Sequence, residues 1–313
     1  MSLIAIGMGV RASGANPFVL TDYPVSRRRK ANAIPTPPPE PFTVSPQPGL
    51  DLHGEEEGHG RALVLVHGLT ATRRYVIQGS RALARSGGLR VVGYDARGHG
   101  DSSRAPDGLY GYPALVADLE AMLDERGIEK AVIAGSSMGA ATAIAFCLEH
   151  PDRVEALVAI TPAYDGQARA TAGALEVWDA RAEALEAGDV DAFVALTGVD
   201  SLPERFRAAA RLAVRQRIER HRDPSAVAEA VRQVPRSAAF DGLDRLSEIA
   251  VPVLVVASGD EADPEHPFAV AGEYARRLPD ARLVTEEEGD PPLAWQGARL
   301  SRAIAAFLDD HRP

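Results

Sequence analysis

A serine between two glycines is the residue of this chain best suited to chemistry. Ser137 stands in Gly135-x-Ser137-x-Gly139, directly after the apolar run 131–134 and before the apolar run 140–148. In a strand–turn–helix context this pattern forms a nucleophile elbow, because glycines leave room for a tight, strained backbone. The elbow would aim the Ser137 hydroxyl outward at a helix N-terminus, where developing negative charge is stabilised.

Strand-like and helix-like segments alternate around this turn. Short apolar runs, typical of strands buried on both faces, cover residues 62–66, 89–94, 131–134, 155–160, 251–257 and 281–285. Apolar residues at helical spacing cover residues 76–86, 112–126 and 296–308. This alternation predicts an α/β fold with a mostly parallel central sheet and helices on both faces.

One long segment interrupts the alternation. Residues 163–235 carry Ala-, Arg- and Glu-rich helical patterns without a strand-like run, so we expect a helical cap inserted into a core of residues 46–162 and 236–313. Residues 1–45 are expected to be an N-terminal extension, since the proline-dense stretch 35–48 favours a stiff linker. Three roles stay open for this arm: wrapping the domain, joining subunits of a homo-oligomer, or disorder.

Composition and charge restrict the class of protein. The 313 residues are 45% hydrophobic and 25% charged, as in ordinary soluble domains. The net charge of −10 argues against a nucleic-acid partner. The apolar first ten residues lack the basic segment of a secretory signal and are too short to span a bilayer. With Cys147 as the single cysteine, no disulfide framework is expected. We therefore predict a cytoplasmic protein with no membrane partner.

Further motifs accompany the serine turn in a characteristic order. They are His67-Gly68, Asp95-x-Arg97-Gly98-His99-Gly100-x-Ser102, His150-Pro151-Asp152-Arg153-Val154 and Val251-Pro252-Val253-Leu254-Val255-Val256. With the serine turn, they resemble the α/β-hydrolase superfamily with a helical cap, over about residues 60–308. The local pattern is similar to enol-lactonases, esterases and carbon–carbon bond hydrolases. The resemblance implies the α/β-hydrolase fold and a reaction without cofactor or metal.

The resemblance also implies roles for individual residues. Ser137 would be the nucleophile, which needs an adjacent base because a free hydroxyl is inert. The backbone N–H groups of Leu69 and Met138 would form the oxyanion hole. His67 and the turn Arg97–Gly100 are expected to be structural.

The acid is expected in the loop that follows the strand at 251–257. Asp263, directly before Pro264, fits the position of the family's acid best, and Asp260 is the runner-up. An acidic surface loop without catalytic function is the alternative interpretation of these carboxylates.

The histidine that the family places shortly after the last strand is missing. Asp290 follows Gly289 at this position, and no histidine lies between His266 and His311. His311, close to the end of the chain, is a poor candidate. Since a carboxylate is a much weaker base than imidazole near pH 7, Asp290 would not serve the same step.

Three hypotheses account for the missing histidine. In the first, His266 is a relocated base, oriented by Asp263 or by Asp165, since such triads are recognised by geometry and not by sequence position. In the second, the protein keeps the fold without hydrolysis, as a pseudoenzyme with a binding, structural or lyase-like role. In the third, an altered loop register, a partner chain or an inactivating substitution explains the gap, with weak residual activity from the elbow and oxyanion hole.

The cap is expected to form much of a substrate pocket. Tyr164, Trp178 and Phe193 are candidate lining residues, and Trp295 of the last loop could reach the pocket. Because aromatic residues are 5% of the chain, we expect a modest, mainly aliphatic pocket. The function predicted is that of a serine hydrolase acting on a small ester, lactone or related acyl compound through a Ser137 acyl-enzyme.

Overall fold

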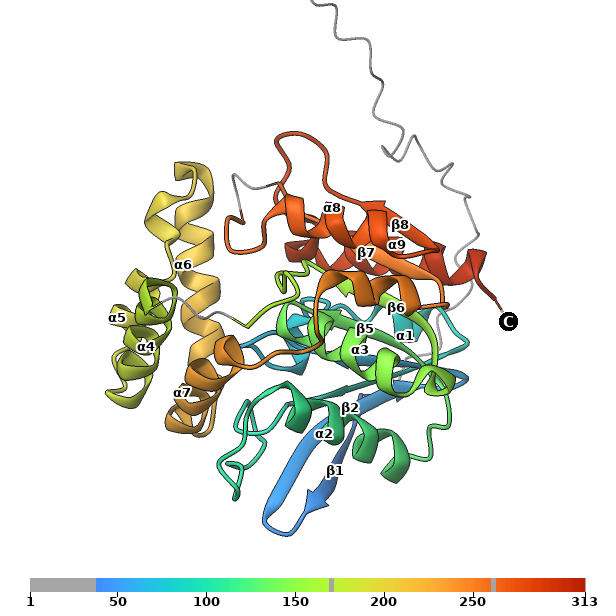
Figure 1. Cartoon of the computed structure of the whole chain (residues 1–313), viewed down its shortest axis with the longest axis horizontal. Helices are drawn as coiled ribbons and strands as arrows, with labels where there is room; N and C mark the ends of the chain where they lie inside the picture. Colours follow the sequence, from blue (N-terminus) through green and yellow to red (C-terminus); the bar gives the residue numbers. More distant parts are fainter. Residues whose placement is uncertain (1–37, 169–171, 260–262, 313) are drawn as a thin grey trace, which may run out of the picture.

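The structure is a computed structural model that describes residues 38–168, 172–259 and 263–312. In these residues an eight-stranded sheet has the strand order β1-β2-β4-β3-β5-β6-β7-β8 (Figure 1). The strands are β1 (Glu40–Gln47), β2 (Leu50–Gly58), β3 (Arg61–Val66), β4 (Leu89–Tyr94), β5 (Ala131–Ser136), β6 (Val154–Ile160), β7 (Val253–Val256) and β8 (Ala281–Val284). The helices are α1 (Ala82–Arg85), α2 (Tyr112–Glu125), α3 (Met138–Glu149), α4 (Ala172–Glu186), α5 (Val190–Leu196), α6 (Glu204–Ile218), α7 (Pro224–Gln233), α8 (Phe268–Arg277) and α9 (Gly297–Asp310).

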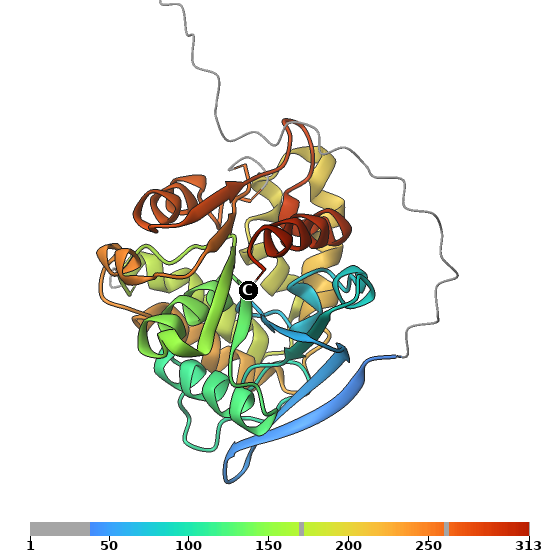
Figure 2. The same cartoon turned by 90° about the vertical axis from the view of Figure 1, so that its right-hand side faces the viewer.

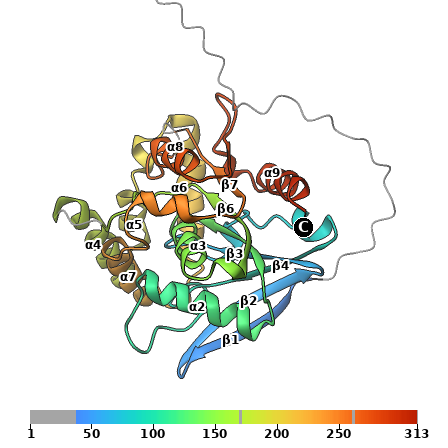
Figure 3. The ribbon, with the colours of Figure 1, turned by 45° about the vertical axis from the view of Figure 1, so that its right-hand side comes forward.

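Both faces of the sheet are covered by helices. In the order of the sheet, neighbouring strands from β4 through β3 to β8 pair in parallel. β2 pairs antiparallel with both of its neighbours, β1 and β4. Successive side chains of β3 enter opposite cores, as the pleat requires: Val64 belongs to the core that includes residues of α2, α3 and α8, and Leu63 to the core that includes residues of α1 and α9. Figure 3 shows these two helical layers on either side of the sheet. The predicted α/β fold with a mostly parallel sheet is therefore confirmed.

The chain between β6 and β7 forms the helical insertion that the sequence predicts. Helices α4 to α7 form a group beside the sheet in Figures 1 and 2, and we call them the inserted helices. They have a small apolar core of their own, which includes Leu185, Phe193, Val227 and Val231. Within the described residues, no helix is long and apolar enough to cross a membrane.

The sheet begins earlier in the chain than the predicted boundary at residue 45. β1 starts at Glu40 and pairs antiparallel with β2, and the side chain of Val44 is buried in the core. Pro41 and Pro46 are compatible with this strand because β1 lies at the edge of the sheet. An edge strand tolerates proline, whose missing N–H need not cost a hydrogen bond of the sheet. The remainder of the predicted extension, up to residue 37, lies outside the described residues.

The helix predicted over residues 76–86 is wrong for most of its length. The α-helix is confined to α1, while Gln78 and Gly79 have φ angles of 50° and 67°. Two successive residues in the left-handed region cannot continue a right-handed helix. The apolar residues Ile77 and Leu83 are nevertheless buried against the sheet.

Candidate active site

Ser137 lies in a strained turn between β5 and α3. Its φ and ψ are 52° and −110°, and its N–H donates to the carbonyl of Ile160 at 2.9 Å. A Cβ on Gly135 would lie 2.1 Å from the carbonyl oxygen of Gly139, and a Cβ on Gly139 would lie 2.1 Å from that of Val66. Because backbone atoms at such distances cannot move aside, the turn requires both glycines. The turn thus has the geometry of the elbow motif.

Two backbone N–H groups beside this turn are unoccupied. Leu69 and Met138 both line the cavity that contains Ser137. In the described part of the chain, neither of their N–H groups donates to a protein acceptor. Gly68 brings the two loops together, since a Cβ there would lie 3.4 Å from the Cβ of Ser137. These donors are therefore available to an oxygen bound above the serine.

His67 holds the loop that carries Leu69. Its Nδ1–H donates to the carbonyl of Gly68 at 2.8 Å, and its Nε2 accepts the N–H of Ala96 at 2.9 Å. Burial, aided by the nearby His221, lowers the pKa of His67 to about 4. A neutral imidazole with both nitrogens occupied cannot take a proton from a substrate, so these contacts fit the structural role expected of His67.

An aspartate and a histidine pair on the loop between β7 and α8. Nδ1 of His266 lies 2.7 Å from Oδ1 of Asp263, and both residues line the cavity of Ser137. Burial disfavours the charged imidazolium, but the Asp263 carboxylate outweighs it and raises the pKa of His266 above its usual value of 6.5. Asp165 is exposed, and Asp260 lies outside the described residues. Of the acids considered for His266, the structure pairs it with Asp263.

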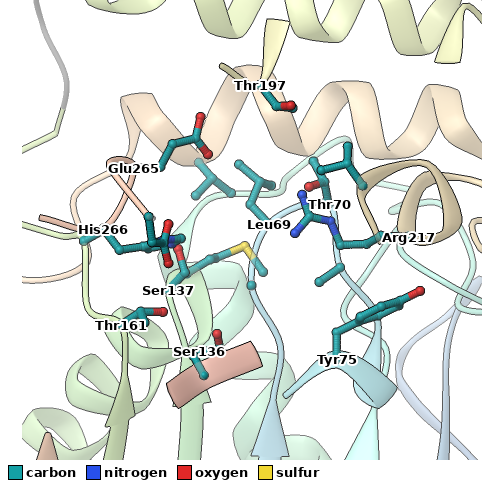
Figure 4. Close-up of a pocket in the computed structure, with 18 of the residues that line it drawn as sticks. Leu69, Thr70, Tyr75, Ser136, Ser137, Thr161, Thr197, Arg217, Glu265 and His266 are labelled. Carbon is teal, nitrogen blue, oxygen red and sulfur yellow. The ribbon is translucent and has the colours of Figure 1, made fainter. Parts of the chain in front are cut away.

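Ser137 and His266 share this cavity without a hydrogen bond between them. Figure 4 shows both side chains on the same side of the cavity. Because Nδ1 of His266 faces Asp263, the other ring nitrogen, Nε2, is left for a second partner. In structures without substrate, such contacts are often long and tighten only when the reactants bind.

The position after the last strand supplies no base. Asp290 forms an ion pair with Arg299 of α9 and does not line the cavity. The carboxylate of Glu286 accepts the N–H groups of Gly259 and Leu293, which fixes this loop as a structural support. The position expected for the histidine therefore lies outside the lining of the cavity that holds Ser137.

The cavity has an ordinary size for a small-molecule site, and two aromatic residues beyond those expected from the sequence, Tyr75 and Tyr112, line it. Its volume is about 780 Å³, within the range common for small-molecule sites. Six aromatic residues line it: Tyr75, Tyr112, Tyr164, Trp178, Phe193 and Trp295. Aliphatic side chains nevertheless outnumber these six rings on the cavity wall, as the prediction of a mainly aliphatic pocket has it; they include Leu69, Met138, Val177, Val214, Val234 and Val270.

The predicted lining residues also have structural contacts. The hydroxyl of Tyr164 donates to the carbonyl of Phe240 at 2.7 Å. The ring of Trp295 meets Phe206 of α6 edge-on, with centroids 6.2 Å apart. The guanidinium of Arg181 lies 4.7 Å from the ring centre of Trp178. Of these contacts, the one between Trp295 and Phe206 joins an inserted helix to the core beside the cavity.

Two arginines of the inserted helices were missed by sequence reasoning. Arg181 of α4 forms an ion pair with Glu265 and donates to the carbonyl of Leu196 at 2.8 Å. Arg217 of α6 reaches into the cavity opposite Ser137 in the view of Figure 4. In a chain with 34 Lys and Arg residues, no local pattern separates these two from the arginines on the surface.

The chain belongs to the α/β hydrolase fold family, because the sequence model of this family matches residues 61–298. It is similar to the mouse (Mus musculus) sn-1-specific diacylglycerol lipase ABHD11, with 38% identity over 99 residues, which are 32% of each chain. It is also similar to the putative carbamate hydrolase RutD of Caulobacter sp. (strain K31), with 27% identity over 74% of this chain and 84% of the relative. The chain thus spans about a third of the length of the mouse lipase.

Solved structures share the fold. A thermophilic esterase from Thermogutta terrifontis, with malate bound, superimposes with a TM-score of 0.72 and 26% identity. The superposition covers 88% of this chain and 99% of the esterase. The predicted membership of the α/β-hydrolase family is confirmed by these comparisons.

Proposed function

We propose that this protein is a serine hydrolase that cleaves a small ester, lactone or related acyl compound through an acyl-enzyme on Ser137. The observation that carries the proposal is the hydrogen-bonded pair of Asp263 and His266 on the wall of the cavity that holds Ser137. The acid and the base would thus both come from the loop after β7. The hydrolase names of several relatives support the reaction class, whereas the substrates in those names differ.

The proposed reaction follows from the orientation of the imidazole. The Nδ1–H of His266 donates to Asp263, so Nε2 is free to accept the proton of Ser137 as Oγ attacks the carbonyl carbon. The N–H groups of Leu69 and Met138 would stabilise the oxyanion. The bond to the leaving group then breaks as His266 returns the proton to it. Water, deprotonated by the same nitrogen, cleaves the acyl-enzyme and releases the acid.

A second candidate is a protein of this fold without hydrolytic activity. It is favoured by Asp290 at the position of the family histidine, and by the absence of a hydrogen bond between Ser137 and His266 among the described residues. Such a protein would bind a small ligand, or catalyse a lyase-like step, in the same cavity.

Labelling by a fluorophosphonate probe and turnover of p-nitrophenyl acetate distinguish the two candidates. We expect the wild type to be labelled and Ser137→Ala not to be labelled. His266→Gln should lose about 10²–10⁴-fold in kcat, as for removal of a general base. The matched control is His59→Gln, at an exposed histidine outside the cavity. A wild type that is neither labelled nor faster than Ser137→Ala would favour the second candidate.

A further inference from the structure

Arg217 is a charged cavity residue for which the proposed reaction has no use. It comes from the last turn of α6 and lines the cavity with Ser137. Among the described residues, its guanidinium has no ion pair and no hydrogen bond, and its Nε is buried without a partner. Arg181, the other arginine of the cavity, is fully engaged by Glu265, Leu196 and Trp178. Arg217 therefore has no structural contact of the kind that Arg181 makes.

An unpaired cation in such a place is unfavourable for the folded protein. Burial lowers the pKa of Arg217, even though Glu265, Tyr75 and Asp263 act in the opposite direction. A guanidinium remains protonated in proteins, so the charge cannot be relieved by losing a proton. Arg217 is half-buried, with its Nε shielded from solvent, and charges that are shielded in this way are normally paired. The missing partner is therefore to be sought in whatever fills the cavity.

The cavity's own carboxylates are already engaged or exposed. Glu265 is ion-paired to Arg181, and Asp263 is hydrogen-bonded to His266. Asp165 also lines the cavity but is exposed. None of the three lies within ion-pair distance of Arg217 among the described residues. The fork of N–H donors on Arg217 is thus open to an anion from outside, and a carboxylate matches its geometry.

We propose that the substrate carries a free carboxylate and that Arg217 binds it while the ester or lactone carbonyl lies at Ser137. This inference rests on the proposed function and names the substrate class as monoesters or related acyl derivatives of dicarboxylic acids. In Figure 4, Arg217 reaches in from the side opposite His266, with Leu69 between them. The carboxylate would therefore bind at one end of the cavity and the base act at the other.

The experiment compares matched acidic and neutral esters. The probes are monomethyl succinate, glutarate and adipate, each against its dimethyl ester, with acid release followed in a pH-stat. We expect the wild type to prefer at least one monomethyl ester. In Arg217→Met the ratio of kcat/KM for that monoester to kcat/KM for its diester should fall about 10–100-fold, as for loss of a hydrogen-bonded charge pair. The matched control is Arg215→Met, which removes a charge from α6 outside the cavity and should keep the wild-type ratio.

Binding in a Ser137→Ala background separates this inference from the proposed function. Calorimetric titration of Ser137→Ala with each of the three monomethyl esters should show, for at least one of them, an affinity that Ser137→Ala/Arg217→Met loses. If the wild type does not hydrolyse esters but this loss is observed, the proposed function fails and the inference stands. The inference would be overturned if Arg217→Met kept the wild-type ratio of monoester to diester kcat/KM and if Ser137→Ala/Arg217→Met bound the monomethyl esters as tightly as Ser137→Ala.

The melting temperature without ligand tests for a merely structural role. Arg217→Met removes an unpaired, half-buried charge and keeps an unbranched side chain, so its melting temperature should equal or exceed that of the wild type. A lower melting temperature together with unchanged ester selectivity would assign Arg217 a packing role instead.

Discussion

At the scale of single residues, the unusual feature is that the proposed acid and base lie three positions apart on one loop. The hydrogen bond of 2.7 Å between Asp263 and His266 fixes the imidazole tautomer and favours the protonated ring. A base with a raised pKa is a stronger proton acceptor but is neutral only at higher pH. The pH at which activity falls should therefore be set in part by Asp263, because Asp263 raises the pKa of His266.

Asp263→Asn tests this dependence. In the wild type, kcat/KM should fall on the acidic side at a pH above 6.5, because His266 must be neutral and its pKa is raised from that value. In Asp263→Asn the imidazolium loses its partner, so the acidic limb should move to lower pH while the maximal rate falls. A pH–rate profile measures both effects. The Asp165→Asn variant should keep the acidic limb of the wild-type profile. A shift of that limb in Asp165→Asn, and not in Asp263→Asn, would make Asp165 the orienting acid.

Residues differ in how far the sequence predicts their role. Ser137 follows from five consecutive positions, because the elbow is a local structure. The choice among Asp260, Asp263 and Asp165 depended on the path of loops, which a motif does not specify. Arg217 had no signal at all, since its distinction is a missing partner, and partners are defined only by the fold.

At the scale of elements, the serine turn requires β3, β5 and α3 to approach one another without side chains between them. A methyl group on Gly139 would meet the carbonyl oxygens of Val66 and His67 at 2.1 and 2.8 Å. Neither of these backbone atoms can move without disturbing β3 or the loop that carries Leu69.

Gly139→Ala should therefore destabilise the protein by about 1–3 kcal/mol or more, as overpacking does. The matched control is Gly272→Ala in α8, where a Cβ meets nothing within 4 Å. Alanine should stabilise that helix by up to about 1 kcal/mol. Denaturant unfolding of both variants gives the comparison. Equal stabilities of the Gly139→Ala variant and the wild type would contradict the close packing of the turn.

The elements themselves were predictable where they are regular. The parallel strands are uniform apolar runs because both of their faces are buried. The hairpin of β1 and β2 was not recognised, since proline in a sequence favours a linker and only the edge position makes it compatible with a strand. The missed break at Gln78 arises from a non-glycine residue at φ 50°, which residue type does not reveal.

At the scale of the whole molecule, three buried histidines join the core to the inserted segment. The ring of His99 lies 5.1 Å from that of His67 and 5.6 Å from that of His221, between centroids. His221, which follows α6, accepts the N–H of Gly100 at 2.8 Å and donates to the carbonyl of Thr70 at 3.0 Å. Burial first, and then the neighbouring histidine, lowers the pKa of His99 and His221 to about 3 each.

Protonation of these three histidines should therefore lower the free energy of unfolding in acid. In the unfolded chain they take up protons near pH 6.5, whereas in the fold they remain neutral until about pH 3–4. Their contribution to stability is present above pH 6.5 and is lost as the pH falls from there. Melting temperatures between pH 8 and pH 4 should show the decline. His99→Phe should flatten it, whereas exposed His59→Gln should not, and equal slopes for His99→Phe and the wild type would exclude this source.

The ion pair between Arg181 and Glu265 has a consequence for opening of the cavity. Glu265 lies between Asp263 and His266 in the chain, while Arg181 belongs to α4. If α4 moves away from the core, it must either break this ion pair or pull on the segment that holds the imidazole. In the proposed reaction, opening the cavity by moving α4 would therefore also disturb the segment that positions His266.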